Sequence, residues 1–146
     1  MNIAVPPPPH LAFLTERSWQ FAFGQVFKTK GDLVVAAPEI PENEVGYWRC
    51  DIARGDLLSW TGGVYRLFGL PVGYEVDRRE AIARYREGSR AILERLRSFS
   101  IDNECGFFLD AKMCGNGSGA NGIRILAMPL LHEGRVVGIH GLKRAL

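Results

Sequence analysis

Two consecutive segments near the C-terminus, residues 122–131 and 136–142, carry apolar side chains at nearly every position. In the first segment both alternating sets are largely apolar, with Ile123, Ile125 and Ala127 in one and Leu126, Met128 and Leu130 in the other. A strand with one face in water alternates apolar and polar residues instead. We therefore expect two neighbouring strands of a sheet that is covered on both faces.

The rest of the pattern predicts the element order ββ-helices-βββ. Besides the two apolar strands, we expect strands at 46–52, 57–60 and 105–112, a short helix at 62–68 and a long helix at 78–99. Gly88 weakens the middle of the long helix, where a break or kink is compatible with the pattern. Hairpins at both ends with helices between them indicate an α+β domain, a five-stranded antiparallel sheet with helices on one face.

The chain divides near residue 44 into an N-terminal extension, residues 1–43, and a domain, residues 44–146. The boundary lies in a proline-punctuated acidic run, residues 38–44, that is typical of a linker. Within the extension, four apolar residues share one face of a helix by their spacing: Trp19, Phe23, Val26 and Phe27. A strand is the alternative, because Trp19, Phe21 and Phe23 alternate with smaller or polar residues. We favour a helix that covers the second face of the sheet or forms a dimer interface.

Composition excludes several classes of protein. Hydrophobic residues make up 47% and charged residues 23% of the 146 residues, with a net charge of +2, which is ordinary for a globular protein. No run of 18 apolar residues predicts a membrane span, and the N-terminus lacks the pattern of a secretory signal. The three cysteines form no metal-binding or disulfide pattern, so we expect no metal site and a reducing, cytoplasmic environment.

Two blocks of sequence resemble a known family. The opening block, GYWRCDI at 46–52 followed by Gly55, Ser59-Trp60 and YRLFGL at 65–70, resembles the start of a PAS domain. The closing block, GRVVGIHG at 134–141, resembles the last PAS hairpin. The resemblance covers about residues 44–146. It implies a bacterial sensory and interaction module that binds a ligand or a protein partner, dimerises, and has no catalytic activity of its own.

The sequence departs from two cofactor-binding subclasses of that family. No histidine lies in a predicted helix, which argues against haem, and no Asn-Cys-Arg-Phe-type motif is present, which argues against a covalent flavin photosensor. No output module follows the last predicted strand, so we expect a stand-alone module that signals to a separate protein.

The resemblance implies a ligand pocket between sheet and helices, which are the usual walls of such a site. The aromatic and polar candidates for its lining are Trp48, Trp60, Tyr65, Phe68, Tyr85, Cys105, Arg124 and His140. The aromatic residues of the extension are the candidates for the dimer interface.

Two other functions stay open. Seven arginines in the predicted helix 78–99 are compatible with binding to an acidic partner or to nucleic acid, although no groove-reading motif is present. A small-molecule enzyme would need a carboxylate beside a pocket histidine such as His140. The Gly-rich run at 117–122 matches a dinucleotide-binding pattern, but the strand predicted after it favours a loop.

Overall fold

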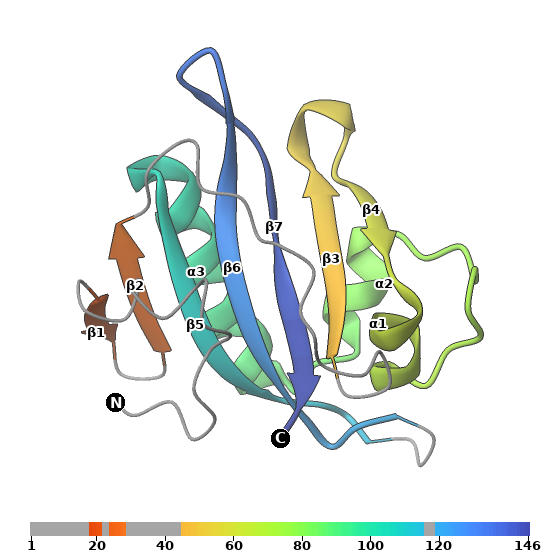
Figure 1. Cartoon of the computed structure of the whole chain (residues 1–146). Coiled ribbons are helices and arrows are strands. Elements are labelled where there is room, and N and C mark those ends of the chain that lie inside the picture. Colours follow the sequence, from red (N-terminus) through yellow and green to blue (C-terminus); the bar gives the residue numbers. More distant parts are fainter. Residues whose placement is uncertain (1–17, 22–23, 29–44, 116–118) are drawn as a thin grey trace.

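The computed structural model describes residues 18–21, 24–28, 45–115 and 119–146. These residues form one antiparallel sheet of seven strands in the order β1-β2-β5-β6-β7-β3-β4 (Figure 1). The strands are β1 (Ser18–Phe21), β2 (Gly24–Lys28), β3 (Val45–Asp51), β4 (Leu57–Trp60), β5 (Cys105–Lys112), β6 (Gly122–His132) and β7 (Arg135–Ala145). The predicted order ββ-helices-βββ is confirmed for residues 45–145.

The helices all cover one face of the sheet (Figure 1). They are α1 (Gly62–Leu67), α2 (Arg78–Ala83) and α3 (Glu87–Asn103). The short turn η2 (Ile52–Arg54) lies in the connection between β3 and β4 and buries none of its residues. Asp77 caps α2, because its side chain accepts a hydrogen bond from the backbone N–H of Glu80 at 2.7 Å. A Cβ at Gly46 would lie 2.4 Å from the backbone nitrogen of Val64, so α1 packs directly on β3 through a position that needs glycine.

The core lies between this helical layer and the sheet. Phe107, Ile125 and Ile139 from three neighbouring strands belong to it, and each is 1% exposed or less. The helices contribute Val64, Leu67 and Leu96 to the same cluster.

The opposite face of the central strands is buried as well. Phe108, Leu126 and Leu142 lie side by side across β5, β6 and β7 and are 3%, 4% and 6% exposed. Met128, also on this face, is 1% exposed. The prediction of a sheet covered on both faces is therefore confirmed for these strands.

The helix predicted for the N-terminal segment is wrong. Trp19 lies in β1, and Val26 and Phe27 lie in β2, while Phe23 is outside the described residues. Backbone pairing of β2 with β5 places the segment in the plane of the sheet, at its edge, instead of across its second face. The apolar spacing fits both the helical and the strand period. Backbone hydrogen bonding to β5 favours the strand.

The single long helix predicted at 78–99 is also wrong, because α2 and α3 are separate. The break falls at residues 84–86, where Tyr85 bridges to Met113 and the N–H of Arg86 donates to the carbonyl of Lys112 at 2.9 Å. Gly88 lies inside the first turn of α3 and does not cause the break. Among the described residues, no helix combines the length and apolar character that crossing a membrane requires.

Candidate functional site

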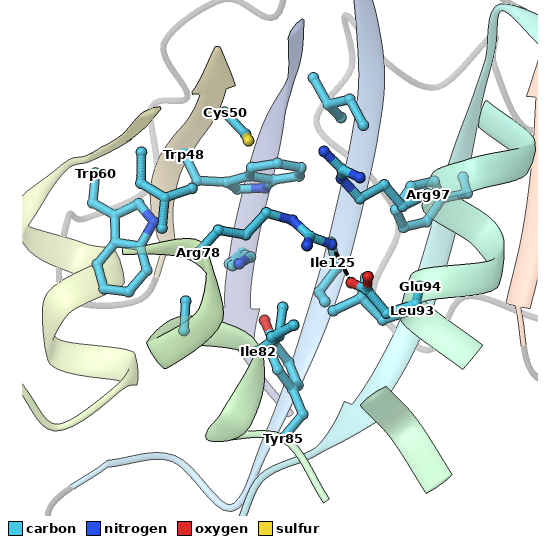
Figure 2. A pocket seen from close by; sticks show the side chains of 15 residues that line it. Trp48, Cys50, Trp60, Arg78, Ile82, Tyr85, Leu93, Glu94, Arg97 and Ile125 are labelled. Atoms are coloured by element: carbon cyan, nitrogen blue, oxygen red, sulfur yellow. Dashed lines mark hydrogen bonds and ion pairs between the residues drawn. The ribbon is translucent and has the colours of Figure 1, made fainter. Parts of the chain in front are cut away.

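A cavity of about 60 Å³ lies between the sheet and helices α2 and α3. Its walls include Trp48 and Cys50 from β3, Ala81 and Ile82 from α2, and Leu93 from α3, and Figure 2 shows several of these side chains around it. A cavity needs roughly 10–15 Å³ to hold one water molecule, so this one has room for several waters or a small organic ligand.

Aromatic rings make up much of the wall. Trp48, Trp60 and Tyr85, all predicted as pocket residues, line the cavity. Phe68 does not line the cavity but contacts two of these rings. It is stacked on Trp60 with 4.6 Å between ring centroids and edge-to-face with Tyr85 with 5.8 Å between them. The ring centroids of Tyr65 and Trp60 are 5.2 Å apart, but Tyr65 does not line the cavity.

The amine of Lys143 in β7 lies within this group of rings. Its Nζ is 4.9 Å from the ring centroid of Trp48, 5.1 Å from Phe68, 5.7 Å from Tyr85 and 6.0 Å from Trp60. Burial lowers the pKa of Lys143 to about 7, because the charged form loses its hydration. The residue is 8% exposed.

Sequence reasoning missed Lys143. The signal was the two-residue period of β7, which places residue 143 on the same face as Ile139. Because the strand was expected to end at 142, this position was left outside it.

Ion pairs join the helices around the cavity. Arg78 at the start of α2 donates to Glu94 of α3, and Figure 2 shows this contact reaching across from one helix to the other. Burial by itself lowers the pKa of Arg78, but the ion pair with Glu94 outweighs it and raises the pKa. Arg97 of α3 donates to Asp56, before β4, at 2.8 Å. Burial also raises the pKa of the Cys50 thiol, which therefore stays protonated near neutral pH.

Five of the eight predicted pocket residues do not line the cavity, which corrects the expectation: Tyr65, Phe68, Cys105, Arg124 and His140. Arg124 and His140 occupy the face of the sheet opposite the cavity, since strand neighbours alternate and Ile125 and Ile139 face the core. Cys105 is buried at the start of β5, where the hydroxyl of Ser100 donates to its carbonyl. One sequence did not specify which set of alternating residues faces inward.

The opposite face has its own buried polar groups. Nε and Nη2 of Arg124 each lie 2.7 Å from a carboxylate oxygen of Asp110, and this hydrogen bonding raises the pKa of Arg124. Burial, with the nearby charge of Arg49, lowers the pKa of His140. His140 is thus not part of the cavity, and the arrangement that would have favoured an enzyme is absent from the described lining.

A second hollow, of about 250 Å³, lies at the other side of Phe68. Glu80 and Arg84 line it and form an ion pair at 3.5 Å, and Cys114 is also part of its wall. Within the described part of the chain, no group of three or more His, Cys, Asp or Glu residues is arranged to hold a metal ion.

Four of the seven arginines in residues 78–99 are engaged within the domain. Arg78, Arg84 and Arg97 are engaged with carboxylates of the same domain. Arg86 donates to the backbone carbonyl of Met113 at 3.2 Å.

Comparison with known proteins gives a structural likeness without a sequence match. No family model matches the sequence, and no curated protein does. The structure of an RNA-binding Light-Oxygen-Voltage receptor matches with a TM-score of 0.60 and 11% identity, over 69% of this chain and 29% of that one. The present chain thus spans less than a third of the receptor's length.

Two further structures match at the level of single domains. One is the domain of a putative light and redox sensing histidine kinase from Haloarcula marismortui, with a TM-score of 0.59 and 12% identity, over 68% of this chain and 87% of that one. The other is the N-terminal domain of a diguanylate cyclase with PAS/PAC sensor from Marinobacter aquaeolei, with a TM-score of 0.61 and 12% identity, over 70% and 94%. The chain therefore has a PAS-like α+β fold, as the sequence blocks predicted.

Proposed function

We propose that this PAS-like domain is a sensory signalling module that binds a small ligand in the cavity between the sheet and helices α2 and α3. The observation that carries the proposal is the lining itself, because sheet and both helices contribute side chains to one small apolar space. The solved structures of similar fold are described as receptors or sensors, which supports the sensory role.

The surroundings of the cavity suggest how binding is passed on. A ligand between the sheet and the helices alters their spacing, and the ion pair between Arg78 and Glu94 links α2 to α3 across that space. Arg97 and Asp56 connect α3 to the turn before β4. Binding therefore favours one arrangement of α2 and α3 over another, and a separate protein reads the difference.

The proposed role is binding without a reaction of its own. The described side chains that line the cavity are mostly apolar, and the one carboxylate among them, Glu94, is held by Arg78. The acidic-partner and nucleic-acid alternatives lose their main support, since several arginines of α2 and α3 already pair with carboxylates. The cytoplasmic location stays a prediction.

Dimerisation also stays a prediction. We expect the N-terminal segment with β1 and β2 to mediate it, and deleting residues 1–40 to abolish the dimer. Light scattering of the full chain and the truncated protein measures the effect. A truncated protein that stays dimeric contradicts this role for the segment.

Ligand binding is tested by NMR with a library of small fragments that includes neutral, acidic and basic compounds. We expect some fragments to shift the indole N–H signals of Trp48 and Trp60, which line the cavity. Ala81→Leu adds bulk to the buried wall, whereas Ala91→Leu makes the same change at an exposed position of α3.

Binding should be lost in Ala81→Leu and kept in Ala91→Leu. If no fragment shifts these signals, or if Ala81→Leu binds as well as the unchanged protein, the cavity is not a ligand site and the proposal fails.

A further inference from the structure

Lys143 carries a buried amine that is paired with no carboxylate of the described residues. Its Nζ lies among four aromatic rings, and none of the ion pairs formed by the described residues includes it. Buried charges are normally paired, because removing a charge from water costs several kcal/mol. An amine at this position therefore has an unfilled capacity to hold an anion.

Tyr85 provides a second, independent observation. The residue is 1% exposed, and its buried hydroxyl oxygen has no hydrogen-bond partner in the part of the chain that the structure describes. The side chain lines the same cavity as Lys143, and Figure 2 shows its hydroxyl directed toward Ile82 and the interior of the site. Nearly all buried hydroxyls in proteins form hydrogen bonds, so an unsatisfied one at a cavity wall is a donor available to a ligand atom.

The charged side chains that line the cavity also favour an anionic ligand. Arg78, Arg97 and Lys143 line the cavity together with one carboxylate, Glu94. Arg78 pairs with Glu94, and Arg97 pairs with Asp56. The excess positive group is Lys143, so an anion is the ligand that completes the site.

Resting on the proposed function, we propose that the ligand is a small monocarboxylate, whose carboxylate accepts hydrogen bonds from Lys143 and Tyr85 while its apolar body lies against Trp48 and Trp60. Two donors, one of them a cation, match the two oxygens of a carboxylate. The cavity volume of about 60 Å³ limits the body to a few carbon atoms.

Binding of a carboxylate is linked to protonation of Lys143. The titratable and charged groups that line the cavity with the amine are Cys50 from β3, Arg78 from α2, Tyr85 after α2, and Glu94 and Arg97 from α3. Cys50 and Tyr85 stay neutral near pH 7, since burial raises the pKa of each. The bound carboxylate stabilises the ammonium form, so the complex takes up a proton at pH values above 7.

The affinity for a carboxylate should therefore fall as the pH rises. Between pH 7.5 and 8.5, where the amine of the empty site is mostly neutral, we expect a decrease of up to about tenfold. The affinity for a neutral ligand of the same shape should not change over this interval.

The test is an NMR titration with butyrate and with butyramide, its neutral analogue, at pH 7.0, 7.5 and 8.5. The indole signals of Trp48 and Trp60 report binding. We expect butyrate to bind at least about tenfold more tightly than butyramide at pH 7, and this preference to shrink at pH 8.5.

Three variants sharpen the test. Lys143→Met keeps the length of the side chain and should remove the preference for butyrate, while Tyr85→Phe removes one hydroxyl and should weaken butyrate binding by about three- to tenfold. Lys112→Met changes an exposed lysine of β5 and should leave both affinities unchanged.

The outcomes separate this inference from the proposed function. If butyramide binds as tightly as butyrate, or if the affinity for butyrate does not depend on pH, the cavity binds ligands but the carboxylate assignment is wrong. If other fragments shift the Trp48 and Trp60 signals while butyrate and its acetate and hexanoate homologues do not, the assignment is likewise wrong. If neither carboxylates nor any fragment bind, the proposed function itself fails.

Discussion

Two buried cations on opposite faces of the same sheet differ in how their charge is held. Arg124 in β6 and Lys143 in β7 are each 8% exposed. Arg124 is bound by two nitrogens to the carboxylate of Asp110, and this contact raises its pKa. Lys143 has aromatic rings around it in place of a carboxylate, and burial lowers its pKa to about 7.

The difference distinguishes a charge that is paired within the fold, on the face of Arg124, from one that a ligand could pair, in the cavity of Lys143. A guanidinium stays charged in a protein, so burying one requires a partner within the fold. An amine can lose its proton instead, so the fold tolerates Lys143 without a partner. The face with Arg124 is thus complete in itself, whereas the cavity with Lys143 gains from an added anion.

The largest effect is expected from Lys143→Met. The pKa of Lys143 is lower in the folded protein than in the unfolded chain, so the unfolded state binds more protons between pH 7 and 10.5 and stability rises with pH there. At pH 7 the substitution should raise the free energy of unfolding by about 4 kcal/mol, because it removes the cost of burying the amine.

Urea denaturation of the unchanged protein should also show a gain of about 1.5 kcal/mol from pH 7 to 8.5, which Lys143→Met abolishes. Lys112→Met, at an exposed position, should keep the pH dependence. A Lys143→Met protein less stable than the unchanged one would show that the amine is held by favourable contacts and would remove the contrast with Arg124.

Asp110→Ala should have the next largest effect, with the opposite sign. It removes the carboxylate that binds Arg124 through two hydrogen bonds. Because the Asp110 side chain is 39% exposed, we expect a loss of about 2 kcal/mol, below the ~3–5 kcal/mol of a fully buried pair. Asp102→Ala, which alters an exposed carboxylate of α3, is the control for the same measurement. Equal stabilities of the two variants would contradict a structural role for the pair.

The loss of stability in acid tests whether His140, on the same face as Arg124, is desolvated in the folded protein. Its pKa is lowered in the folded protein by burial and by Arg49, so the unfolded chain binds the proton more tightly and stability falls as the pH drops through the ordinary range of histidine. Between pH 7 and 5, His140→Gln should reduce this loss by on the order of 1 kcal/mol, measured by thermal unfolding. His132→Gln, at a residue whose side chain is 73% exposed, should not alter it. An unchanged acid response in His140→Gln would argue against a desolvated imidazole.

The smallest effect is expected at the rim of the cavity. Arg97→Met breaks the ion pair with Asp56, whose two side chains are 20% and 38% exposed. Partly exposed pairs contribute little, so the free energy of unfolding should fall by about 0.5–1 kcal/mol. Arg95→Met, at an exposed position of the same helix, should change it less. A loss as large as that of Asp110→Ala would show that the rim pair is as structural as the pair on the opposite face.

Most of the element order in residues 45–146 was predictable because its signals are local. Alternating apolar residues and turn residues placed β5, β6 and β7 within a few positions, and the apolar character of both alternating sets in β6 predicted two covered faces. Trp48, Trp60 and Tyr85, which line the cavity, were candidates because the resemblance implied a pocket between sheet and helices. Tyr85 itself lies at the break between α2 and α3, which the sequence did not predict. Arg124 and His140 were candidates for the pocket that lie on the opposite face, because a two-residue period divides a strand into two sets without saying which is inner.

The sequence by itself determined the α+β class, the order of the central elements and a sheet with two apolar faces, since side-chain period and turn chemistry act over neighbouring residues. The tertiary structure decided that residues 18–28 extend the sheet edge, that the helix breaks at Tyr85, and that Lys143 is enclosed by rings from β3, β4 and the helical layer. Each of these depends on partners far away in the chain. Backbone groups pair with whichever edge is open, and a charge loses its hydration when distant segments pack around it.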